Sequence, residues 1–329
     1  MEEILIIGVD VSKSTLDIFV KPAGLTSHIE NNESGFKKWY QELQRINQSC
    51  SKPLVVMEHT GQYSYRFEAF LRTQGIGYCK MAALEIKRSL GMIRGKNDKV
   101  DAKRIAEYAW LRKDILLADP FCSEKTQRLK RLLSLRAIIV KDRAGYIVRL
   151  KEMKAAGVCT KIDLEGRVQQ QLIGFLTTKI KLLETEIRTL ITEDEAMKKT
   201  CQLLRTIKGV GWIIAAYMIG YTENFTRFTN ARKFNCYAGL APFAHESGSS
   251  IKGKARVSHL ANKEAKTLLN LAASSAIRYN EEMRTYYQRR VQEGKRKMSC
   301  LNIIRSKIVA RMFAVIKRQT PYQERPLAA

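Results

Sequence analysis

Residues 4–20 read ILIIGVDVSKSTLDIFV, and this stretch decides the fold of the first part of the chain. An apolar run at Ile4–Val9 leads into Asp10, and a second run follows at Leu16–Val20. Short apolar runs rich in β-branched residues, with a few polar residues between them, are typical of neighbouring strands. We therefore expect two consecutive strands here, with an acidic residue closing the first.

Strands and helices alternate through the remainder of residues 1–118. The pattern predicts strands at 27–29, 54–57 and 78–82, and helices at 34–46, 63–73, 84–90 and 98–111. Three strands close together, followed by alternating helices and strands, indicate a mixed α/β sheet. Asp119-Pro120 marks the end of this region.

The rest of the chain is predicted to be mainly helical. Residues 124–200 carry no strand signal, and a heptad spacing runs through Ile173, Leu176, Ile180, Leu183, Ile187 and Leu190. This pattern predicts a coiled-coil hairpin with its connection near 155–165, or a local helical bundle. Beyond residue 201, Ile207–Gly211 is a Gly-x-Gly turn between two predicted helices. Such a turn is typical of a helix-hairpin-helix element, whose amides can receive a phosphate, and also of ordinary tight connections.

The charge of the chain indicates a polyanionic partner. It holds 58 Lys and Arg against 32 Asp and Glu, a net charge of +26. The excess recurs throughout and is strongest at 128–154 and 284–318, where apolar residues lie among the cations. Ordered basic helices of this kind favour nucleic acid as the partner, with a solvated face or an anionic membrane surface as alternatives.

Several classes of protein do not fit the sequence. The 45% hydrophobic content excludes a disordered basic tail. No apolar run reaches the roughly 20 residues of a membrane span, and the opening MEEILIIGVD lacks the basic region of a secretory signal. The seven cysteines form no CxxC pair, which argues against a zinc knuckle or a disulfide framework. We expect a cytosolic, reduced protein.

Four acidic residues are candidates for a metal site. Asp10 and Glu58 each close a predicted strand, so both are expected at the carboxyl edge of the sheet. Asp98 and Asp101 are spaced to face the same way from the first turn of a helix. Carboxylates gathered in this way suit two hard divalent cations and phosphodiester chemistry. The alternative is that the strand-end acids face solvent and Asp98 only caps its helix. His59 is expected to be structural.

Taken in order, these motifs resemble those of the DEDD-type transposases of bacterial insertion sequences. Relatives of that family include the Piv-type DNA invertases, and many members are regarded as recombinases guided by a bridge RNA. The resemblance covers nearly the whole chain and rests on motifs at 8–17, 56–61, 96–102, 207–211, 237–242 and 246–254. Two positions depart from the common pattern, Asn97 before the third acid and Ala261 before Asn262.

The resemblance implies an architecture and a chemistry. Residues 1–118 would form a RuvC-like, RNase H-like domain whose DEDD acids, binding Mg²⁺, are Asp10, Glu58, Asp98 and Asp101. Residues 119–200 would form a helical coiled coil, and 201–329 a mainly α transposase domain with Ser247 as nucleophile. Its partners would be target and donor DNA, a non-coding guide RNA, and further copies of the chain, as a dimer or tetramer that shares active sites. Its place would be the bacterial cytoplasm, associated with the nucleoid.

The surroundings of Ser247 fit a nucleophile that attacks phosphate. It lies in a stretch of small polar residues, 245–250, expected to be a loop and followed by the cations Lys252, Lys254 and Arg256. Such cations would stabilise the charge of a pentacovalent phosphate. A serine hydroxyl needs activation, and the local candidate bases are His245 and Glu246. Alternatively, Ser247 only hydrogen-bonds DNA, and Ser249, Ser250 and Ser258 compete with it as the nucleophile.

Three other functions fit parts of the sequence. A nuclease of the Holliday-junction-resolvase type would use the four acids with water as nucleophile. A non-catalytic nucleic-acid-binding protein would use only the basic helices and the Gly-x-Gly turn. A sugar-kinase-like or actin-like ATPase can also open with Gly8-Val9-Asp10, but the chain shows no second glycine-rich phosphate loop.

Overall fold

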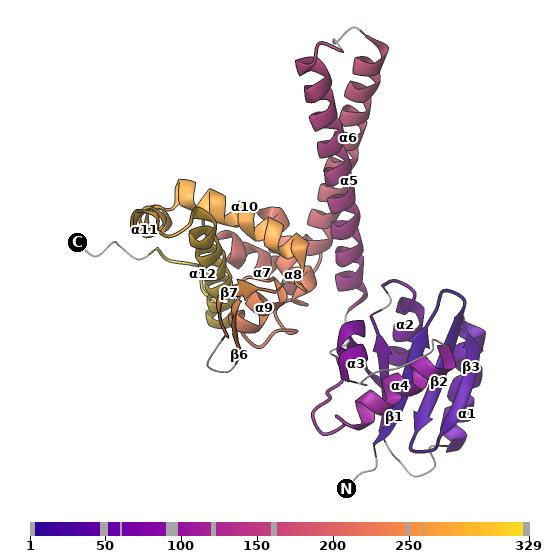
Figure 1. Ribbon diagram of the computed structural model, residues 1–329. Helices are drawn as coiled ribbons and strands as arrows, with labels where there is room; N and C mark the ends of the chain where they lie inside the picture. Colours follow the sequence, from indigo (N-terminus) through magenta and orange to yellow (C-terminus); the bar gives the residue numbers. More distant parts are fainter. Residues whose placement is uncertain are drawn as a thin grey trace. The chain divides into compact units, whose positions relative to one another are not determined.

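The computed structural model describes residues 4–46, 52–59, 61–89, 98–119, 123–158, 163–247, 251–258 and 260–324, except for the side chains of 88, 89, 98, 99, 244–247, 251, 252 and 254. The chain divides into two compact units, residues 1–121 and 122–329. Figure 1 shows a sheet with helices in the first unit and mainly helices in the second.

The first unit is built on a five-stranded sheet. Its strands are β1 (Leu5–Val11), β2 (Thr15–Lys21), β3 (Leu25–Glu30), β4 (Pro53–Glu58) and β5 (Gly77–Met81). Their order is β3-β2-β1-β4-β5; the first three are antiparallel, and β4 and β5 run parallel to β1. This is the mixed sheet that the sequence predicts.

Helices cover both faces of this sheet. On one face, α1 (Glu33–Ile46) and α2 (Tyr65–Thr73) bury Trp39 and Phe67 against alternate residues of the strands. On the other, α3 (Ala83–Ser89) and α4 (Asp98–Trp110) bury Ile86 and Ile105, respectively. The sheet therefore has an apolar core on each side, and the candidate site forms on the α4 side.

Two long helices open the second unit. They are α5 (Glu124–Ala155) and α6 (Leu164–Thr192), which pack against each other as an antiparallel hairpin (Figure 1). The heptad positions of α6 are buried or half-buried, and an ion pair of 2.6 Å joins Arg136 of α5 to Glu184 of α6. Over the described residues, no helix has the length and apolar character needed to cross a bilayer.

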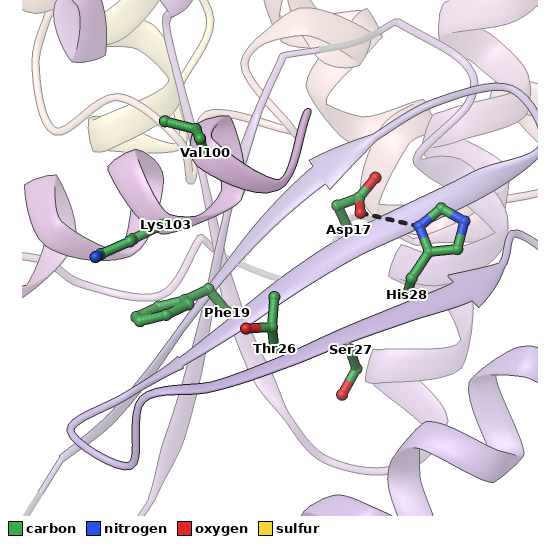
Figure 2. Close-up of a pocket in the computed structure, with 7 residues that line it drawn as sticks. All are labelled: Asp17, Phe19, Thr26, Ser27, His28, Val100 and Lys103. Atoms are coloured by element: carbon green, nitrogen blue, oxygen red, sulfur yellow. Dashed lines mark hydrogen bonds and ion pairs between the residues drawn. The ribbon is translucent and has the colours of Figure 1, made fainter. Parts of the chain in front are cut away.

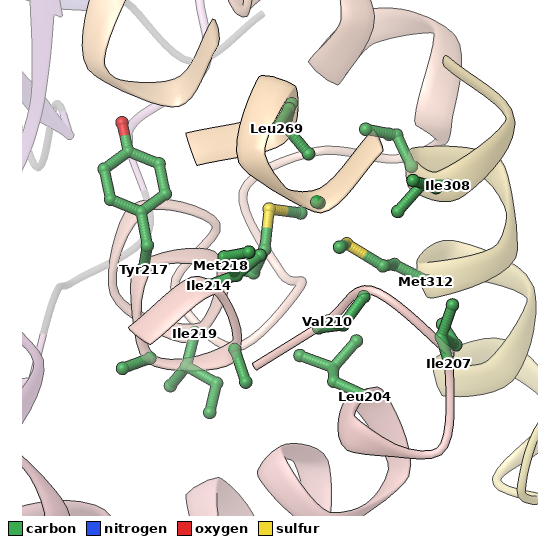
Figure 3. Close-up of a cluster of buried hydrophobic side chains, with 14 of the residues drawn as sticks. Leu204, Ile207, Val210, Ile214, Tyr217, Met218, Ile219, Leu269, Ile308 and Met312 are labelled. Atoms are coloured by element: carbon green, nitrogen blue, oxygen red, sulfur yellow. The ribbon is translucent and has the colours of Figure 1, made fainter. Parts of the chain in front are cut away.

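The remaining helices share one core. They are α7 (Glu195–Arg205), α8 (Trp212–Tyr221), α9 (Ala231–Tyr237), α10 (Lys263–Tyr279), α11 (Glu281–Gln292) and α12 (Lys297–Arg318). Ile207, Met218, Leu269 and Met312 meet in that core from four different segments (Figure 3). α8 is apolar all round, and its residues from Ile214 to Gly220 are buried, so it forms the centre of the unit.

One element of the second unit differs from the sequence prediction. Residues 245–247, expected to lie in a loop at 245–250, belong instead to β6 (Pro242–Ser247), which forms an antiparallel hairpin with β7 (Ile251–Val257). The expectation of a loop failed because the segment is rich in Gly, Ser and Lys, which disfavour strands by propensity. Backbone pairing between the two segments overrides that propensity.

Candidate nucleic-acid-processing site

Asp10 lies on the face of the sheet that carries α4. Along β1, Val9 belongs to the core under α1 and α2, whereas Ile6 belongs to the core that Ile105 of α4 helps to form. Since successive strand residues face opposite sides, Asp10 shares the face of Ile6. The half-buried Asp10 is therefore directed to the α4 side, close to the carboxyl end of β1.

Glu58 stands beside Asp10. β1 and β4 are parallel and in register up to Val9 and Met57, and each acid is the next residue of its strand. Val56 contributes to the core on the α4 side, so Glu58, two residues later, faces the same way. The structure thus brings these two predicted acids together at one edge of one face.

The other two predicted acids reach this face on α4. A methyl group added at Gly8 would lie 2.4 Å from the carbonyl oxygen of Ala102, so α4 rests directly on the backbone of β1. Asp101 precedes Ala102, and its half-buried carboxylate accepts a hydrogen bond of 2.7 Å from Arg104. Asp98 is the first residue of α4, and its side chain lies outside the described part of the structure.

The donor set fits a hard divalent cation. Carboxylate oxygens are the ligands that Mg²⁺ and related ions prefer, and backbone placement alone brings Asp10, Glu58 and the first turn of α4 to one face. Among the described side chains, which do not include that of Asp98, no three acidic, His or Cys groups already form a metal-binding group. Asp101 is instead paired with Arg104, which offsets part of the negative charge there.

Sequence reasoning missed a further acid on this face. Asp17 of β2 is the cross-strand partner of Asp10, and only 7% of its surface is exposed. Its Oδ1 lies 2.9 Å from Nδ1 of His28 on β3. The alternation of buried Leu16 and Ile18 around Asp17 was the signal that it turns away from their core.

A pocket of about 500 Å³ opens beside Asp17. Its walls come from β2, β3 and the start of α4, and Figure 2 shows the residues that line it, Asp17, Phe19, Thr26, Ser27, His28, Val100 and Lys103. In the same view Asp17 and His28 point toward each other, whereas Lys103 lies farther along α4. The pocket exposes one side of the Asp17–His28 pair to solvent.

Ser247, the predicted nucleophile, lies in the second unit as the last residue of β6 and pairs with Ile251 of β7. Its side chain and those of His245 and Glu246 are outside the described part, as are Ser249 and Ser250 entirely. Among its competitors, the Ser258 hydroxyl accepts a hydrogen bond of 3.1 Å from the amide of Leu260. The structure therefore locates the Ser247 backbone at the end of a strand, rather than within the expected loop.

Side-chain amides fix both ends of this hairpin to the helical core. At the start, Nδ2 of Asn302 on α12 donates to the carbonyl oxygen of Leu240 at 2.7 Å. At the end, Asn262 donates through Nδ2 to the Tyr237 hydroxyl at 2.7 Å and accepts from the Tyr217 hydroxyl at 3.0 Å. Burial raises the pKa of Tyr217, so this hydroxyl keeps its proton and remains a donor.

The Gly-x-Gly turn is largely part of the core. Gly209 has a φ of +96°, and a methyl group there would lie 2.5 Å from the carbonyl oxygen of Ala272 on α10. Ile207 and Val210 are buried on either side of it. Gly211, which precedes α8, borders open space, so it is the end of the turn that an outside group can approach.

Some of the cations in the basic stretches are already engaged. On α12, Arg305 is buried, and burial lowers its pKa. Arg311 of the same helix pairs with Glu282 at 2.6 Å. Near the start of α8, the guanidinium groups of Arg188 and Arg205 lie 5.5 and 4.8 Å from the ring centre of Trp212. Arg188 and Arg205 fit a phosphate-facing surface better than Arg305 does, since cations stacked on a half-buried ring keep access to solvent.

Comparisons with known proteins find transposases and a DNA-inverting protein among the relatives of this chain. A model of DEDD transposases of the IS110 type matches residues 7–153, and a model described as "Transposase IS116/IS110/IS902 family" matches residues 201–288. The pilin gene-inverting protein of Moraxella bovis is 25% identical over 97% of this chain and 98% of its own length. The IS1111A transposase of Coxiella burnetii is 24% identical over 85% of this chain and 79% of its own. A Thermus thermophilus RuvC structure, solved with a Holliday junction, covers 36% of this chain and 99% of its own, with 10% identity and a TM-score of 0.27.

Proposed function

The chain belongs to the IS110 family of DEDD transposases and is a DNA recombinase, and from this we propose that it cuts and rejoins DNA through Ser247 with the help of a divalent cation held by its acids. The observation that supports this most directly is the neighbouring placement of Asp10 and Glu58 on the face where α4 brings Asp101. We assign the metal chemistry to residues 1–118, the helical connection to 119–200, and the serine chemistry to 201–329.

Asp10, Glu58, Asp98 and Asp101 are the proposed ligands, and Mg²⁺ is the proposed ion. When bound, such an ion polarises phosphate oxygens and stabilises the charge that develops on them. The role of the chain is to hold the ligands on one rigid face. Asp101 is paired with Arg104, so an ion bound here would share this carboxylate with the guanidinium group.

Ser247 is the proposed nucleophile. Its Oγ would attack phosphorus and form a phosphoserine bond, while the bond from phosphorus to the deoxyribose oxygen breaks. The serine proton passes to a local base, His245 or Glu246, and the leaving sugar oxygen takes up a proton. Attack by a strand-end hydroxyl on the phosphoserine reverses these changes and joins the strands, with no external energy source. Lys252, Lys254 and Arg256 on β7 provide positive charge for the phosphate.

The partners we propose are target and donor DNA, a non-coding guide RNA and further copies of the chain in a dimer or tetramer. The net charge of +26 supports contacts to several phosphodiester backbones at once. One of the relatives is named for inverting a pilin gene, which supports strand exchange rather than simple cutting. Target choice would then lie in RNA pairing, with the protein supplying cleavage, joining and backbone contacts.

A covalent adduct tests the proposal. The protein is co-expressed with the non-coding DNA that flanks its gene, incubated with Mg²⁺ and a plasmid that carries the element junction, denatured, and analysed by mass spectrometry. We expect DNA attached to Ser247, lost in Ser247→Ala and in Asp10→Ala, and retained in the control Ser258→Ala. Cut DNA without an adduct would indicate the metal-dependent nuclease that uses water. Binding without any cutting would indicate the non-catalytic protein.

A further inference from the structure

A row of polar residues crosses three strands of the first sheet. Asp10 of β1 pairs with Asp17 of β2, and Asp17 pairs with His28 of β3. Paired residues of antiparallel strands point to the same face, with their β-carbons about 5 Å apart. Asp17 therefore lies between a proposed metal ligand and a histidine, on the α4 side of the sheet.

The placement of Asp17 is costly for the fold. Two like charges directly opposite on neighbouring strands destabilise a sheet, and Asp17 is also almost fully buried. An ionised Asp17 carboxylate can only accept in this 2.9 Å contact, which requires the His28 tautomer or imidazolium that carries a hydrogen on Nδ1. This contact fixes one oxygen of Asp17 and compensates part of the cost of its burial.

We propose that Asp17 and His28 are positioning residues of the metal site, a role that rests on the proposed function of Asp10. Asp17 adds negative charge next to Asp10, and His28 holds the Asp17 carboxylate in place from the far side. A cation at Asp10 relieves the repulsion between the two acids, so the same pairing that weakens the empty site strengthens the loaded one.

The pocket beside the pair argues against a purely structural role. A contact that served only the packing of β2 on β3 would be enclosed by apolar side chains, but here a cavity of about 500 Å³ borders both Asp17 and His28. His28 is more than half exposed in its side chain. The pair thus borders a pocket (Figure 2), and Asp17 is the cross-strand partner of the proposed ligand Asp10.

Direct metal binding to the full-length protein tests the role without any DNA. Titration calorimetry with Mn²⁺ or Mg²⁺ compares the wild type with Asp17→Asn, which keeps the shape and the acceptor oxygen but loses the charge. We expect affinity to fall about tenfold in Asp17→Asn and severalfold in His28→Ala. His28→Gln, which keeps an N–H donor, should recover part of the loss. Glu42→Gln, which removes an exposed carboxylate from α1 on the opposite face, should bind as the wild type does.

A second readout separates positioning from folding. In the absence of metal, Asp17→Asn should unfold at a temperature equal to or above that of the wild type, since it removes the repulsion with Asp10. A variant that binds metal as tightly as the wild type, or whose affinity falls only because it is unfolded, would overturn the role of Asp17. If Asp10→Asn binds metal as tightly as the wild type, the proposed metal site itself fails. If Asp10→Asn loses metal binding and Asp17→Asn does not, the metal site stands and only the role of Asp17 is excluded.

Discussion

Gly8 of β1 and Ala102 of α4 touch so closely that a single methyl group on Gly8 would lie 2.4 Å from the Ala102 carbonyl oxygen. The amide nitrogen of Ala106, one turn later on α4, would be equally close to that methyl group. No side chain separates the helix from the strand at this point. Since Asp10 is two residues from Gly8 and Asp101 is next to Ala102, the absence of a side chain at Gly8 sets the distance between proposed ligands.

Gly8→Ala should therefore disturb the site as well as the fold. The added methyl group meets backbone atoms, which cannot move aside as a flexible side chain can, and overpacking of this kind costs about 1–3 kcal/mol. We expect a lower thermal unfolding temperature by circular dichroism and a larger loss of strand cleavage than the fall in stability explains.

Gly174→Ala is the matched control for Gly8→Ala. Gly174 lies within α6 and has open space where a methyl group would go. Alanine in a helix interior is more stable than glycine by roughly 0.5–1 kcal/mol, so this variant should gain stability and keep its activity. An equally active Gly8→Ala protein would show that α4 does not set the position of the acids.

The first unit could be predicted from sequence because its signals are local. The alternation of Leu16, Ile18 and Val20 gives both the strand and its buried face, and Asp10 and Glu58 end apolar runs. What the sequence could not show is register. Asp17 belonged to a recognised motif, but its position opposite Asp10 and beside His28 depends on which residues pair across the strands.

Each proposed ligand should be separable from folding. We expect Asp10→Asn, Glu58→Gln, Asp98→Asn and Asp101→Asn to reduce strand cleavage by at least about 100-fold while nucleic-acid binding persists, because amides ligate divalent cations poorly. Asp101→Asn additionally loses its ion pair with Arg104. Cleavage is measured on a labelled duplex, with Glu42→Gln as the control, and a variant that cleaves at the wild-type rate would remove its residue from the ligand set.

Association with nucleic acid should depend steeply on salt. Each phosphate contact releases counterions, so a protein with six to ten such contacts loses about 10³-fold or more in affinity between 50 and 200 mM salt. Fluorescence anisotropy with a labelled duplex and a labelled RNA measures the two slopes. An affinity that does not change with salt would contradict an electrostatic interface on this chain of net charge +26.

Asn262 should be necessary for the position of the hairpin formed by β6 and β7, here called the serine hairpin because it carries Ser247. Its side chain joins Tyr217, Tyr237 and the amide of Ala265, and it follows β7 by five residues. Asn262→Ala removes the hydrogen-bond partner of the hydroxyls of buried Tyr217 and half-buried Tyr237, at a cost of about 1–3 kcal/mol. We expect a destabilised second unit and less adduct at Ser247. Tyr217→Phe removes only one hydrogen bond and should lower the free energy of unfolding less than Asn262→Ala does. Equal effects of the two variants would argue against Asn262 as the residue that joins Tyr217, Tyr237 and α10.

The serine hairpin itself could not be predicted from composition. Residues of β6 and β7 include Gly, Ser and Lys, which individually favour turns or solvent. Their strand structure comes from pairing with each other and from anchors far along the chain, Asn302 on one side and Tyr217 on the other. The same holds for Arg305, which reads as one more surface cation but is buried under α10 through its contact with Asn270.

The stability of the second unit should change with pH through Glu264, the second residue of α10. Burial raises the pKa of this carboxyl above its usual value, and the opposing effects of the Tyr221 hydrogen bond and the Arg136 charge do not cancel the rise. The folded state therefore holds the proton more tightly than the unfolded state, so the contribution to stability is full below the unfolded pKa and is lost as the pH rises through the folded pKa.

Glu264→Gln carries no charge and keeps an acceptor for Tyr221. Urea unfolding followed by circular dichroism, to which the helices of this unit contribute most, should show the variant to be more stable than the wild type at pH 7.5. That advantage should shrink toward pH 4, and an advantage of the same size at both pH values would mean that the charge of Glu264 is not its cause.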